Sequence, residues 1–378
     1  MKVMLGLSGG VDSAVAAYLL KKQGYDVVCC FMRNWDSLAN NDYLGNPTVD
    51  NSICPQEQDY LDAKDVADRL NLPLLRIDFI KEYWDYVFSY FLDEYKKGRT
   101  PNPDIFCNKY IKFGPFIDFA KKNGCDKIAM GHYAKKIVDQ DGIPHLYKAF
   151  DKNKDQSYFL SQINHDQLDF CLFPLGDIEK TEVRKIAEEL NLVSVKEKKD
   201  STGICFIGER NFKEFLKNYI PASQGNIVEI NTNKIIGKHD GVMYYTLGQR
   251  RGLGIGGIKD LKSNGFFVCK KDIKNNILYV ANGKEDEHLN SDSCIINMVN
   301  LYNNKIKDGT QLCAKFRYRQ EDKKVTVYNL ENGDIKLIFD ESYKAITPGQ
   351  ACVLYDGEEC LGGGIIDKVF YKGKIKDY

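Results

Sequence analysis

The sequence predicts an α/β protein: a doubly wound parallel sheet in the N-terminal half, followed by an all-β half. Three observations support this prediction. In the first half, short apolar runs alternate with helical segments, the order expected for parallel strands joined by helices. From Gly225 onward, β runs are separated by Asn, Gly and Asp turns, which is typical of barrels. The length of 378 residues, of which 43% are hydrophobic, is enough for two or three domains.

The N-terminal half supplies the elements of the parallel sheet. We expect strands at 2–7, 27–32, 73–77 and 127–130. We expect helices at 12–24, 59–70, 81–97 and 109–123. Residues 36–57 are polar and turn-rich, and we interpret them as an insertion or flexible loop.

The β half follows a last helix, expected at 212–219. Its strands are predicted in VMYYTLGQR, GFFVCKK, NILYVANG, QLCAKFRYR, KKVTVYNL and ACVLYDGEECLGGGII. We therefore expect an α/β domain over 1–206, a small linking domain over 207–282 and a C-terminal β-barrel over 283–378.

Charge and cysteine content exclude some classes of protein. Lys plus Arg and Asp plus Glu number 53 each, but a neutral protein can still bind nucleic acid through a local basic patch. The twelve cysteines include no Cys-x-x-Cys, which argues against a structural zinc site or a four-cysteine cluster. We see no signal peptide and no long apolar run, so we expect a cytoplasmic protein with reduced thiols. A cysteine pair that matters is then more often catalytic than structural.

Residues 6–13, GLSGGVDS, form a candidate phosphate-binding loop between the first strand and the first helix. Gly9 and Gly10 let the backbone approach phosphate oxygens, and the helix N-terminus presents free N–H groups to an anion. Two serines add hydroxyl donors, and Asp12 is placed to hold Mg²⁺ against a pyrophosphate. The loop lacks the Gly-Lys-Ser/Thr ending of a γ-phosphate hydrolase. The alternative interpretation is a glycine turn before an N-capped helix.

Two cysteines lie in turn-rich segments beside charged residues: Cys107 in RTPNPDIFCNK and Cys205 in DSTGICFIGER. Cys107 precedes Lys109 and the expected helix, which predicts a lowered thiol pKa. Cys205 follows Gly203, which permits a tight turn. Either cysteine is also compatible with a buried small hydrophobe. That is our interpretation of Cys29, Cys30, Cys125, Cys269 and Cys313.

The loop resembles the PP-loop of the ATP pyrophosphatase superfamily, whose members adenylate their substrates and release pyrophosphate. Longer strings resemble one family within it, the bacterial tRNA-specific 2-thiouridylases. These strings are GLSGGVDS, FMRNWD, GRTPNPDIFCNKYIKF, MGHYA, KDQSYFL, DSTGICFIGER, YTLGQRRGLGIGG and TPGQACVLYDGEECLGGG. They extend over nearly the whole chain. Members of that family thiolate C2 of the wobble uridine in the tRNAs for Lys, Glu and Gln.

The resemblance implies a role for particular residues of this chain. It implies that ATP binds with Mg²⁺ at Gly6, Leu7, Ser8, Gly9, Gly10, Val11, Asp12 and Ser13, with Met32 and Gly131 on the adenine side. It implies that Cys205 carries a persulfide and that Cys107 either attacks C2 or reduces the persulfide to sulfide. A Cys107–Cys205 disulfide between turnovers follows. A cysteine desulfurase or a sulfur relay protein would load Cys205.

The same resemblance implies contacts with tRNA. Asn102, Pro103 and Asp104 match the segment that holds the target base, and Asp104 is the candidate acid/base. The other implied tRNA contacts are His132, Lys154, Asp155, Gln156, Arg317, Tyr318 and Gln350.

The chemistry is consistent with this interpretation. A uridine carbonyl is a poor electrophile, so ATP must supply a leaving group, and sulfur delivered as a persulfide leaves a cysteine pair to be reset. Two alternatives stay open. A PP-loop small-molecule synthetase needs neither the cysteine pair nor a barrel. A non-catalytic RNA-binding protein with a vestigial loop would release no pyrophosphate.

Residues 230–274 are a weaker signal for RNA binding. They carry nine Lys or Arg and three Asp, which suits RNA backbone contacts. Four interleaved aromatic residues are candidates for base stacking: Tyr244, Tyr245, Phe266 and Phe267. The alternative is a solvated face. Gly252, Gly254 and Gly257 match G-x-G-x-x-G, but no βα unit surrounds them, so we favour a loop near RNA over a dinucleotide site.

Overall fold

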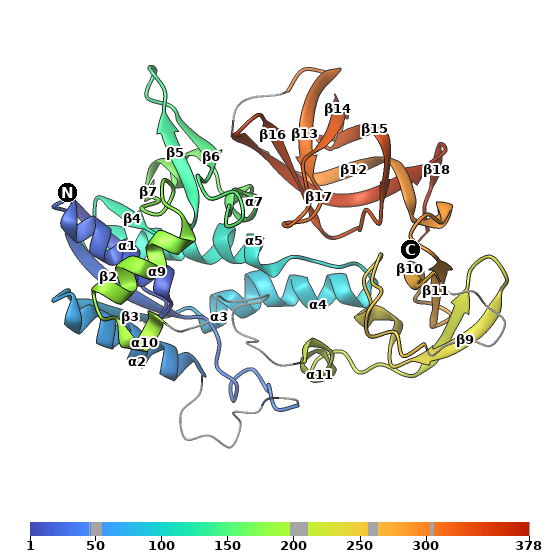
Figure 1. The fold of residues 1–378 in the computed structure, drawn as a ribbon, viewed down its shortest axis with the longest axis horizontal. Coiled ribbons are helices and arrows are strands. Elements are labelled where there is room, and N and C mark those ends of the chain that lie inside the picture. The colour runs from blue at the N-terminus through green and yellow to red at the C-terminus, as the bar shows by residue number, and fades with distance from the viewer. Residues whose placement is uncertain (45, 47–54, 197–210, 256–263, 303–305, 378) are drawn as a thin grey trace.

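The N-terminal unit is built on a parallel sheet, as the sequence predicts. The computed structural model describes residues 1–44, 46, 55–196, 211–255, 264–302 and 306–377 (Figure 1). The sheet has the strand order β3-β2-β1-β4-β7, and every pairing in it is parallel. Its strands are β1 (Lys2–Gly6), β2 (Asp26–Arg33), β3 (Leu74–Asp78), β4 (Lys127–Ala129) and β7 (Cys171–Leu172).

Helices cover both faces of this sheet, and the alternation of side chains along β1 shows why. Val3 and Leu5 are buried in one apolar cluster, whereas Met4 is buried in another. The first cluster includes side chains of α1 (Val11–Lys22), α2 (Pro55–Arg69), α9 (Lys180–Glu189) and α10 (Val193–Lys196). The second includes side chains of the aromatic helices that follow β3. The doubly wound architecture is therefore confirmed.

The aromatic segment expected at 81–97 forms one helical rod with a π-turn inside it. The rod consists of α3 (Ile80–Tyr83), the π-turn η1 (Trp84–Phe88) and α4 (Ser89–Lys96). In Figure 1, α4 runs from the N-terminal unit toward the central domain. Its buried Phe91 and Tyr95 rings contact Phe212, so the rod joins two parts of the chain.

The next helical segment begins earlier than the sequence reading expected. Instead of one helix at 109–123, the structure has α5 (Pro103–Cys107), a π-turn η2 (Asn108–Lys112) and α6 (Pro115–Lys122). Asn102 caps α5, because its side chain accepts a hydrogen bond from the Asp104 N–H at 3.1 Å, and proline suits the first helical position. Cys107 therefore lies inside a helical segment that continues from α5 into η2, and not just before the start of a helix.

The remaining short elements of the first half connect the sheet to the rest of the protein. They are the hairpin β5 (Ala134–Val138) and β6 (Pro144–Lys148), α7 (Ser157–Leu160) and α8 (His165–Asp169). The last helix, α11 (Phe212–Lys217), lies where the sequence predicted one.

The all-β half has two parts. The central part is a sheet of order β10-β11-β8-β9 with a single 3₁₀ turn, η3 (Val242–Tyr244). Its strands are β8 (Gly225–Glu229), β9 (Lys234–His239), β10 (Phe266–Asp272) and β11 (Ile277–Asn282). A second 3₁₀ turn, η4 (Glu287–Leu289), leads into the last part.

The C-terminal part is a closed barrel, because its first strand pairs with its last long strand. Its strands are β12 (Asn290–Leu301), β13 (Thr310–Lys315), β14 (Lys323–Asn329), β15 (Ile335–Lys344), β16 (Ala351–Asp356) and β17 (Glu359–Tyr371), with the short β18 (Lys374–Ile375) beside β17. Hairpin strand β6 also pairs with β17, so the N-terminal unit extends the sheet of the barrel. Across the described residues, no helix is long and apolar enough to span a bilayer.

Candidate active site

The candidate phosphate loop lies between β1 and α1 with the geometry that its glycines predict. Gly9 has φ +73°, and a Cβ on it would overlap the Asp59 carbonyl oxygen of α2. Gly10 is the N-cap of α1. Ser13 closes the loop, because its hydroxyl accepts from the Ser8 N–H and donates to the Gly10 carbonyl, both at 3.1 Å. The backbone is thus shaped to leave the N-terminus of α1 for an anion.

Two residues that the resemblance assigns to the adenine side lie against this loop. A Cβ on Gly6 would lie 3.0 Å from Met32 Cε, so the thioether of Met32 packs on the end of β1. A Cβ on Gly131 would lie 2.9 Å from the Ser13 nitrogen, so only glycine lets the end of β4 approach the start of α1. The structure therefore brings Met32 and Gly131 to the loop from β2 and from the end of β4, the strands on either side of β1.

Asp12 is held by two residues that sequence reasoning missed. Its Oδ1 accepts from Tyr133 Oη at 2.8 Å and from Lys180 Nζ at 2.6 Å. The Lys180 side chain is only 8% exposed, although it is a charged residue at the start of an amphipathic helix. No motif marks Lys180, and MGHYA was read for His132 and not for Tyr133.

Residues 154–156 contact Tyr133 through Gln156. Gln156 Oε1 accepts from the Tyr133 N–H at 3.0 Å. The side chain of Asp155 is buried, and it accepts from Ala149 N at 3.0 Å and from Ser157 Oγ at 2.9 Å. Asp155 thus shapes the turn with its side chain, whereas Lys154 is half-exposed.

Cys107 lies in a different electrostatic environment from the one that the sequence predicted. Its thiol is 2% exposed, and burial raises its pKa to about 11, although the positive charge of Lys112 acts in the opposite direction. The expectation of a lowered pKa is therefore wrong for this conformation. The cysteine follows the first turn of α5, and desolvation outweighs the neighbouring lysine.

Lys112, and not Lys109, is the cation beside the candidate catalytic groups. Lys109 donates to Gln162 at 3.0 Å. In the π-turn η2, the Phe113 N–H bonds to the Asn108 carbonyl five residues back, so Lys112 lies one wide turn after Cys107. The positive charge of Lys112 opposes the rise that burial causes in the pKa of Cys107 and of Asp104. It adds to the lowering that burial causes in the pKa of His132.

We expect Lys112→Gln to raise the pKa of Cys107 and to slow its alkylation at pH 8 by about threefold to tenfold, the equivalent of half to one pKa unit. The reason is that the variant removes the charge that favours the thiolate. The rate of modification by iodoacetamide, followed by mass spectrometry against pH, measures the effect. Lys109→Gln is the matched control, and an equal slowing in both variants would contradict the assignment to Lys112.

Asp104 is half-buried in the first turn of α5, and desolvation raises its pKa to about 6, with Lys112 opposing the shift. A carboxyl group with this pKa can exchange a proton near neutral pH, as an acid/base requires. Asn102, Pro103 and Asp104 form the cap and the first turn of the helix that ends at Cys107. The segment predicted to hold the base and the candidate nucleophile thus belong to one helical element.

We expect Asp104→Asn to stabilise the protein by about 1–2 kcal/mol at pH 8 and to abolish thiolation. A carboxyl whose folded pKa is raised costs stability as the pH rises from its unfolded value near 4 to about 6 and above. The gain should therefore vanish near pH 4. Denaturant unfolding at pH 4.5 and pH 8 measures it. Asp118→Asn, at an exposed position in the first turn of α6, is the control, and equal behaviour of the two variants would refute the burial argument.

His132 follows β4 at the same edge of the sheet. It is 8% exposed and packs near the Phe113 and Phe173 rings, at 5.9 and 6.5 Å between centroids. Burial and the charge of Lys112 hold its pKa well below the usual value, so the imidazole is neutral. Among the described residues, no hydrogen-bond partner reaches its Nδ1.

Arg317, Tyr318 and Gln350 lie where the barrel meets the rest of the protein. The Arg317 guanidinium donates to the Leu247 carbonyl at 2.7 Å and to the Ala345 carbonyl at 2.8 Å, which joins the central sheet to the barrel. Tyr318 packs on the Phe159 ring with centroids 4.3 Å apart. The side chains of Arg317 and Tyr318 therefore make contacts within the protein.

The barrel also contacts the segment that leads into α5. Gln350 donates to the Thr100 carbonyl at 2.6 Å. Arg99 pairs with Glu94 at 2.6 Å and with Asp367 of β17 at 2.8 Å. These two ion pairs fix the approach of the barrel to the Cys107 helix.

Cys205, the second candidate catalytic residue, lies outside the described residues, as does Cys54. The description resumes at Asn211, which caps α11 by accepting from the Lys213 N–H at 2.9 Å. The distance between Cys107 and Cys205 therefore stays untested.

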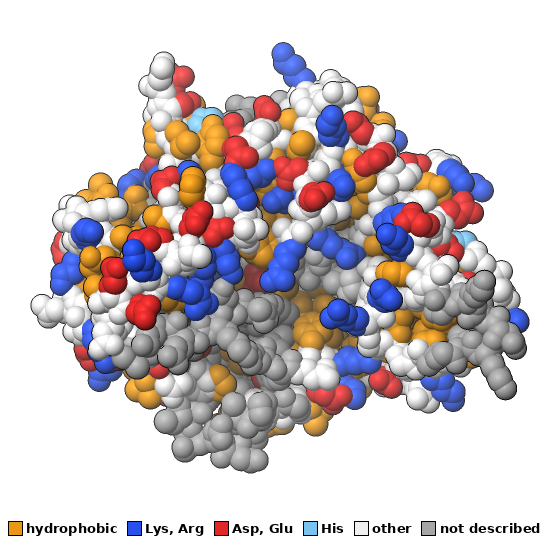
Figure 2. Space-filling model, in the orientation of Figure 1, with side chains coloured by type: hydrophobic (Ala, Val, Ile, Leu, Met, Phe, Trp, Pro, Cys, Tyr) orange, Lys and Arg blue, Asp and Glu red, His pale blue; other side chains and the backbone are white. Residues whose placement is uncertain are grey.

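The space-filling view shows Lys and Arg side chains over the middle of one face, between the N-terminal unit and the barrel (Figure 2). In the central part, Tyr244, Tyr245 and Phe266 are buried, so the prediction that they stack on RNA bases is wrong. Their apolar pattern belongs to the core of this part. Phe267 is half-exposed instead and lies 5.8 Å from the Arg250 guanidinium.

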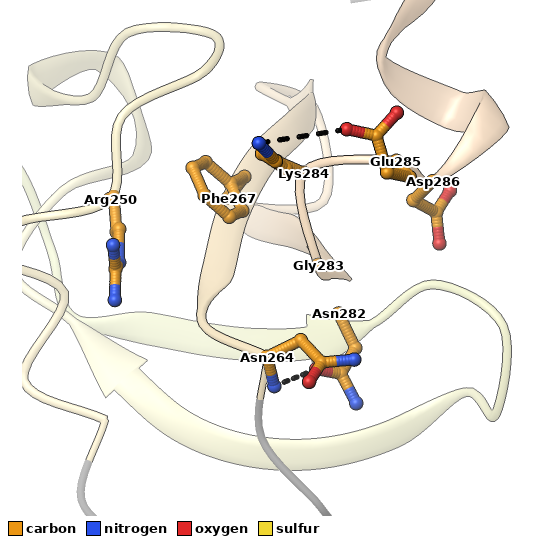
Figure 3. A pocket seen from close by; sticks show the side chains of 8 residues that line it. All are labelled: Arg250, Asn264, Phe267, Asn282, Gly283, Lys284, Glu285 and Asp286. Atoms are coloured by element: carbon orange, nitrogen blue, oxygen red, sulfur yellow. Dashed lines mark hydrogen bonds and ion pairs between the residues drawn. The ribbon is translucent and has the colours of Figure 1, made fainter.

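Phe267 and Arg250 line a pocket of about 660 Å³ (Figure 3). Lys284, Glu285 and Asp286 form much of the rest of its wall, so the pocket carries charges of both signs. Its lining residues come from the central part and from the turn that leads into the barrel. Gly252 and Gly254 have positive φ in a nearby turn, and Gly257 lies outside the described residues.

Among the described residues, no group of three or more His, Cys, Asp or Glu side chains is arranged to hold a metal ion. Asp12 is the one acidic residue within residues 6–13. A Mg²⁺ ion often takes one or two carboxylates together with substrate phosphates and waters, so a single carboxylate is compatible with Mg²⁺ arriving with ATP.

Comparison with known proteins gives one consistent result over the whole chain. A family model described as the tRNA methyl transferase HUP domain matches residues 1–209. A tRNA methyl transferase PRC-barrel domain matches 213–282, and an aminomethyltransferase beta-barrel domain matches 291–366.

Curated relatives extend this result to full length. The tRNA-specific 2-thiouridylase MnmA of Mycoplasma capricolum subsp. capricolum is 56% identical over 375 residues, 97% of this chain and 99% of the relative. That of Mycoplasmopsis synoviae is 56% identical and covers 100% of this chain and 98% of the relative, and that of Staphylococcus carnosus is 52% identical and covers 98% and 96%. This chain therefore belongs to the tRNA-specific 2-thiouridylase family.

Proposed function

We propose that this protein is a tRNA-uridine 2-sulfurtransferase, which replaces the C2 oxygen of the wobble uridine in the tRNAs for Lys, Glu and Gln by sulfur. One observation carries the proposal: a chain 56% identical to 2-thiouridylases over its full length has a PP-loop after β1, and the residues after β4 lie against both this loop and the Cys107 segment. Gly131 abuts the loop, and the adjacent His132 packs near Phe113 of the Cys107 segment.

In the activation step, ATP lies with its phosphates on residues 6–13 and its adenine near Met32 and Gly131. The uridine O2 attacks the α-phosphate, pyrophosphate leaves, and O2 becomes part of an AMP leaving group. Backbone N–H groups at the start of α1 stabilise the phosphate charge that develops. Mg²⁺, held by Asp12 and the phosphates, would add charge neutralisation at the pyrophosphate.

In the sulfur step, the terminal sulfur of a Cys205 persulfide reaches C2, and AMP leaves with the former O2. Cys107 completes the electron balance by one of two routes. In the first, Cys107 attacks C2 and expels AMP, the outer persulfide sulfur displaces Cys107 from C2, and the freed Cys107 thiolate attacks Cys205 Sγ, which leaves the outer sulfur on C2. In the second, Cys107 attacks Cys205 Sγ and releases sulfide, which attacks C2 and expels AMP. Both routes end in a Cys107–Cys205 disulfide that a thiol reductant resets. Because burial raises the pKa of Cys107, we propose that tRNA binding, or movement of its segment, exposes the thiol before reaction.

The base-holding segment, Asn102 to Asp104, would position the uridine. Asp104 would move the proton that activation and sulfur attack require. We propose that Lys154, Gln156 and His132 contact tRNA directly. We propose that Asp155, Arg317, Tyr318 and Gln350 act mainly by fixing the surfaces that tRNA meets, because each makes contacts within the protein.

The domains divide this work. We propose that residues 1–206 carry the chemistry and that residues 283–378 bind tRNA, with residues 207–282 between them. A cysteine desulfurase or sulfur relay protein would supply the persulfide. The reaction suits the cytoplasm, where tRNA, ATP and reduced thiols coexist.

Thiolation in vitro tests the proposal. The full-length protein is incubated with unmodified wobble-uridine tRNA, ATP, Mg²⁺ and a persulfide donor, and 2-thiouridine, AMP and pyrophosphate are quantified. We expect the three products in equal amounts, and none with a tRNA that carries cytidine at the wobble position. Pyrophosphate release without tRNA would favour a small-molecule synthetase, and tRNA binding without pyrophosphate release would favour a non-catalytic RNA-binding protein.

A further inference from the structure

The phosphate loop has no positively charged side chain of its own. Residues 6–13 contain neither Lys nor Arg. In Walker loops a lysine within the motif reaches the phosphates, and here that residue type is missing. Backbone N–H groups and the helix N-terminus supply only partial charges. A full positive charge at the triphosphate must therefore come from Mg²⁺ or from another part of the chain.

Lys180 brings a positive charge to this loop from the start of α9. Its side chain is 8% exposed, and its Nζ lies 2.6 Å from Asp12 Oδ1. Its backbone N–H donates to Asp151 Oδ2 at 3.0 Å, which fixes the first turn of the helix. The ammonium also lies 5.9 Å from the centroid of the Tyr133 ring, whose hydroxyl bonds the same Asp12 oxygen. These contacts fix the orientation of the Lys180 side chain relative to the loop.

We propose that Lys180 binds the phosphates of ATP and supplies the cation that the loop lacks, with Asp12 and Tyr133 holding it in place before ATP arrives. The proposal rests on the ATP step of the proposed function. An ammonium group has three N–H donors, so Lys180 can keep its bond to Asp12 and also donate to a phosphate oxygen. Asp12 and Ser13 open the helix on which the phosphates lie, so a ligand there is within reach of the ammonium.

Nucleotide binding to the full-length protein tests this assignment without tRNA or persulfide. Calorimetry is carried out with ATP and with adenosine, each with Mg²⁺ and with EDTA. We expect Lys180→Met to weaken ATP binding by at least about tenfold in both conditions, and adenosine binding by less than about twofold. Lys185→Met is the matched control, because Lys185 lies on the same helix with its side chain 65% exposed, and it should change neither affinity.

The alternative is that Lys180 only neutralises Asp12, and a double variant separates the two roles. If Lys180 contacts phosphate, Asp12→Asn/Lys180→Met binds ATP about tenfold more weakly than Asp12→Asn alone. Equal affinities of these two variants would overturn the proposal. Adenosine binding shows in each variant whether the site is folded.

If Lys180→Met also loses adenosine binding, Lys180→Arg decides, since it keeps the charge. ATP affinity within about threefold of wild type supports the proposal. A tenfold loss of ATP affinity with normal adenosine binding contradicts it. Because these assays contain no tRNA, failure of thiolation and failure of the Lys180 contact are distinguishable.

Discussion

Replacing Cys107 by Ser is expected to lower the rate of tRNA thiolation by about 10³-fold or more, while ATP and tRNA still bind. Serine has nearly the volume of cysteine, and the 2% exposed position should accept it with little change in packing. The serine hydroxyl cannot form the thiolate that attacks a persulfide. Because uridine activation precedes the sulfur step, the variant should still release about one pyrophosphate per bound tRNA and then stop.

The assay compares single-turnover pyrophosphate release with 2-thiouridine formation in the wild type and in Cys107→Ser. Cys125→Ser is the control, because Cys125 is a buried thiol of the same apolar cluster with no proposed role. Normal thiolation by Cys107→Ser with a protein persulfide would exclude Cys107 from the mechanism.

Added inorganic sulfide separates the two routes open to Cys107. If Cys107 serves to release sulfide from the persulfide, sulfide should restore thiolation to the Ser variant. If Cys107 attacks C2 itself, sulfide should restore little activity. The result therefore assigns the role that neither the sequence nor the static geometry distinguishes.

The sequence predicted the fold well because the fold depends on local patterns. Apolar strands alternate with amphipathic helices because both faces of the sheet are covered by helices. In β1, Val3 is buried against one face of the sheet and Met4 against the other. The phosphate loop was also predicted from sequence, because the positive φ of Gly9 and the close approach of Gly131 to α1 are constraints that only glycine satisfies. The resemblance named Met32, which the structure brings to the same loop.

The pKa of the Cys107 thiol was not predicted correctly from sequence, because it depends on burial. The Asn102–Pro103 pair is a helix start signal that was read as a turn, so the helix was placed after the cysteine instead of around it. With the cysteine inside the helical segment, desolvation outweighs the neighbouring cation. The choice of cation also depended on an undetected π-turn, which puts Lys112 and not Lys109 beside the thiol.

Contacts between distant parts of the chain carried no local signal at all. Lys180 reaches Asp12 from a helix that reads as an ordinary amphipathic surface helix. Hairpin strand β6 joins barrel strand β17 across the expected boundary between domains. Tyr244 and Tyr245 matched an RNA-stacking pattern, but the core of the central part uses the same residue types. Long-range packing decides each of these cases.

Gly9→Ala is expected to abolish ATP binding and to cost about 2–4 kcal/mol of unfolding free energy. Two effects add. The residue has φ +73°, which costs an L-amino acid about 1 kcal/mol or more. The new Cβ would also overlap the Asp59 carbonyl oxygen, so either α2 moves away or the loop flips out of the conformation that leaves the N-terminus of α1 for phosphate. Calorimetric titration with ATP and denaturant unfolding measure the two losses.

Gly24→Ala isolates the contribution of the clash. Gly24 ends the same helix with φ +84°, but a Cβ there meets nothing within 4 Å. It should therefore carry a similar backbone strain, lose about 1 kcal/mol of stability and bind ATP normally. Equal stability losses in the two variants would mean that backbone conformation alone makes glycine necessary at position 9. A Gly9→Ala protein that binds ATP with wild-type affinity would mean that the phosphates do not lie on this loop, because the loop cannot keep its shape beside α2 once a side chain separates them.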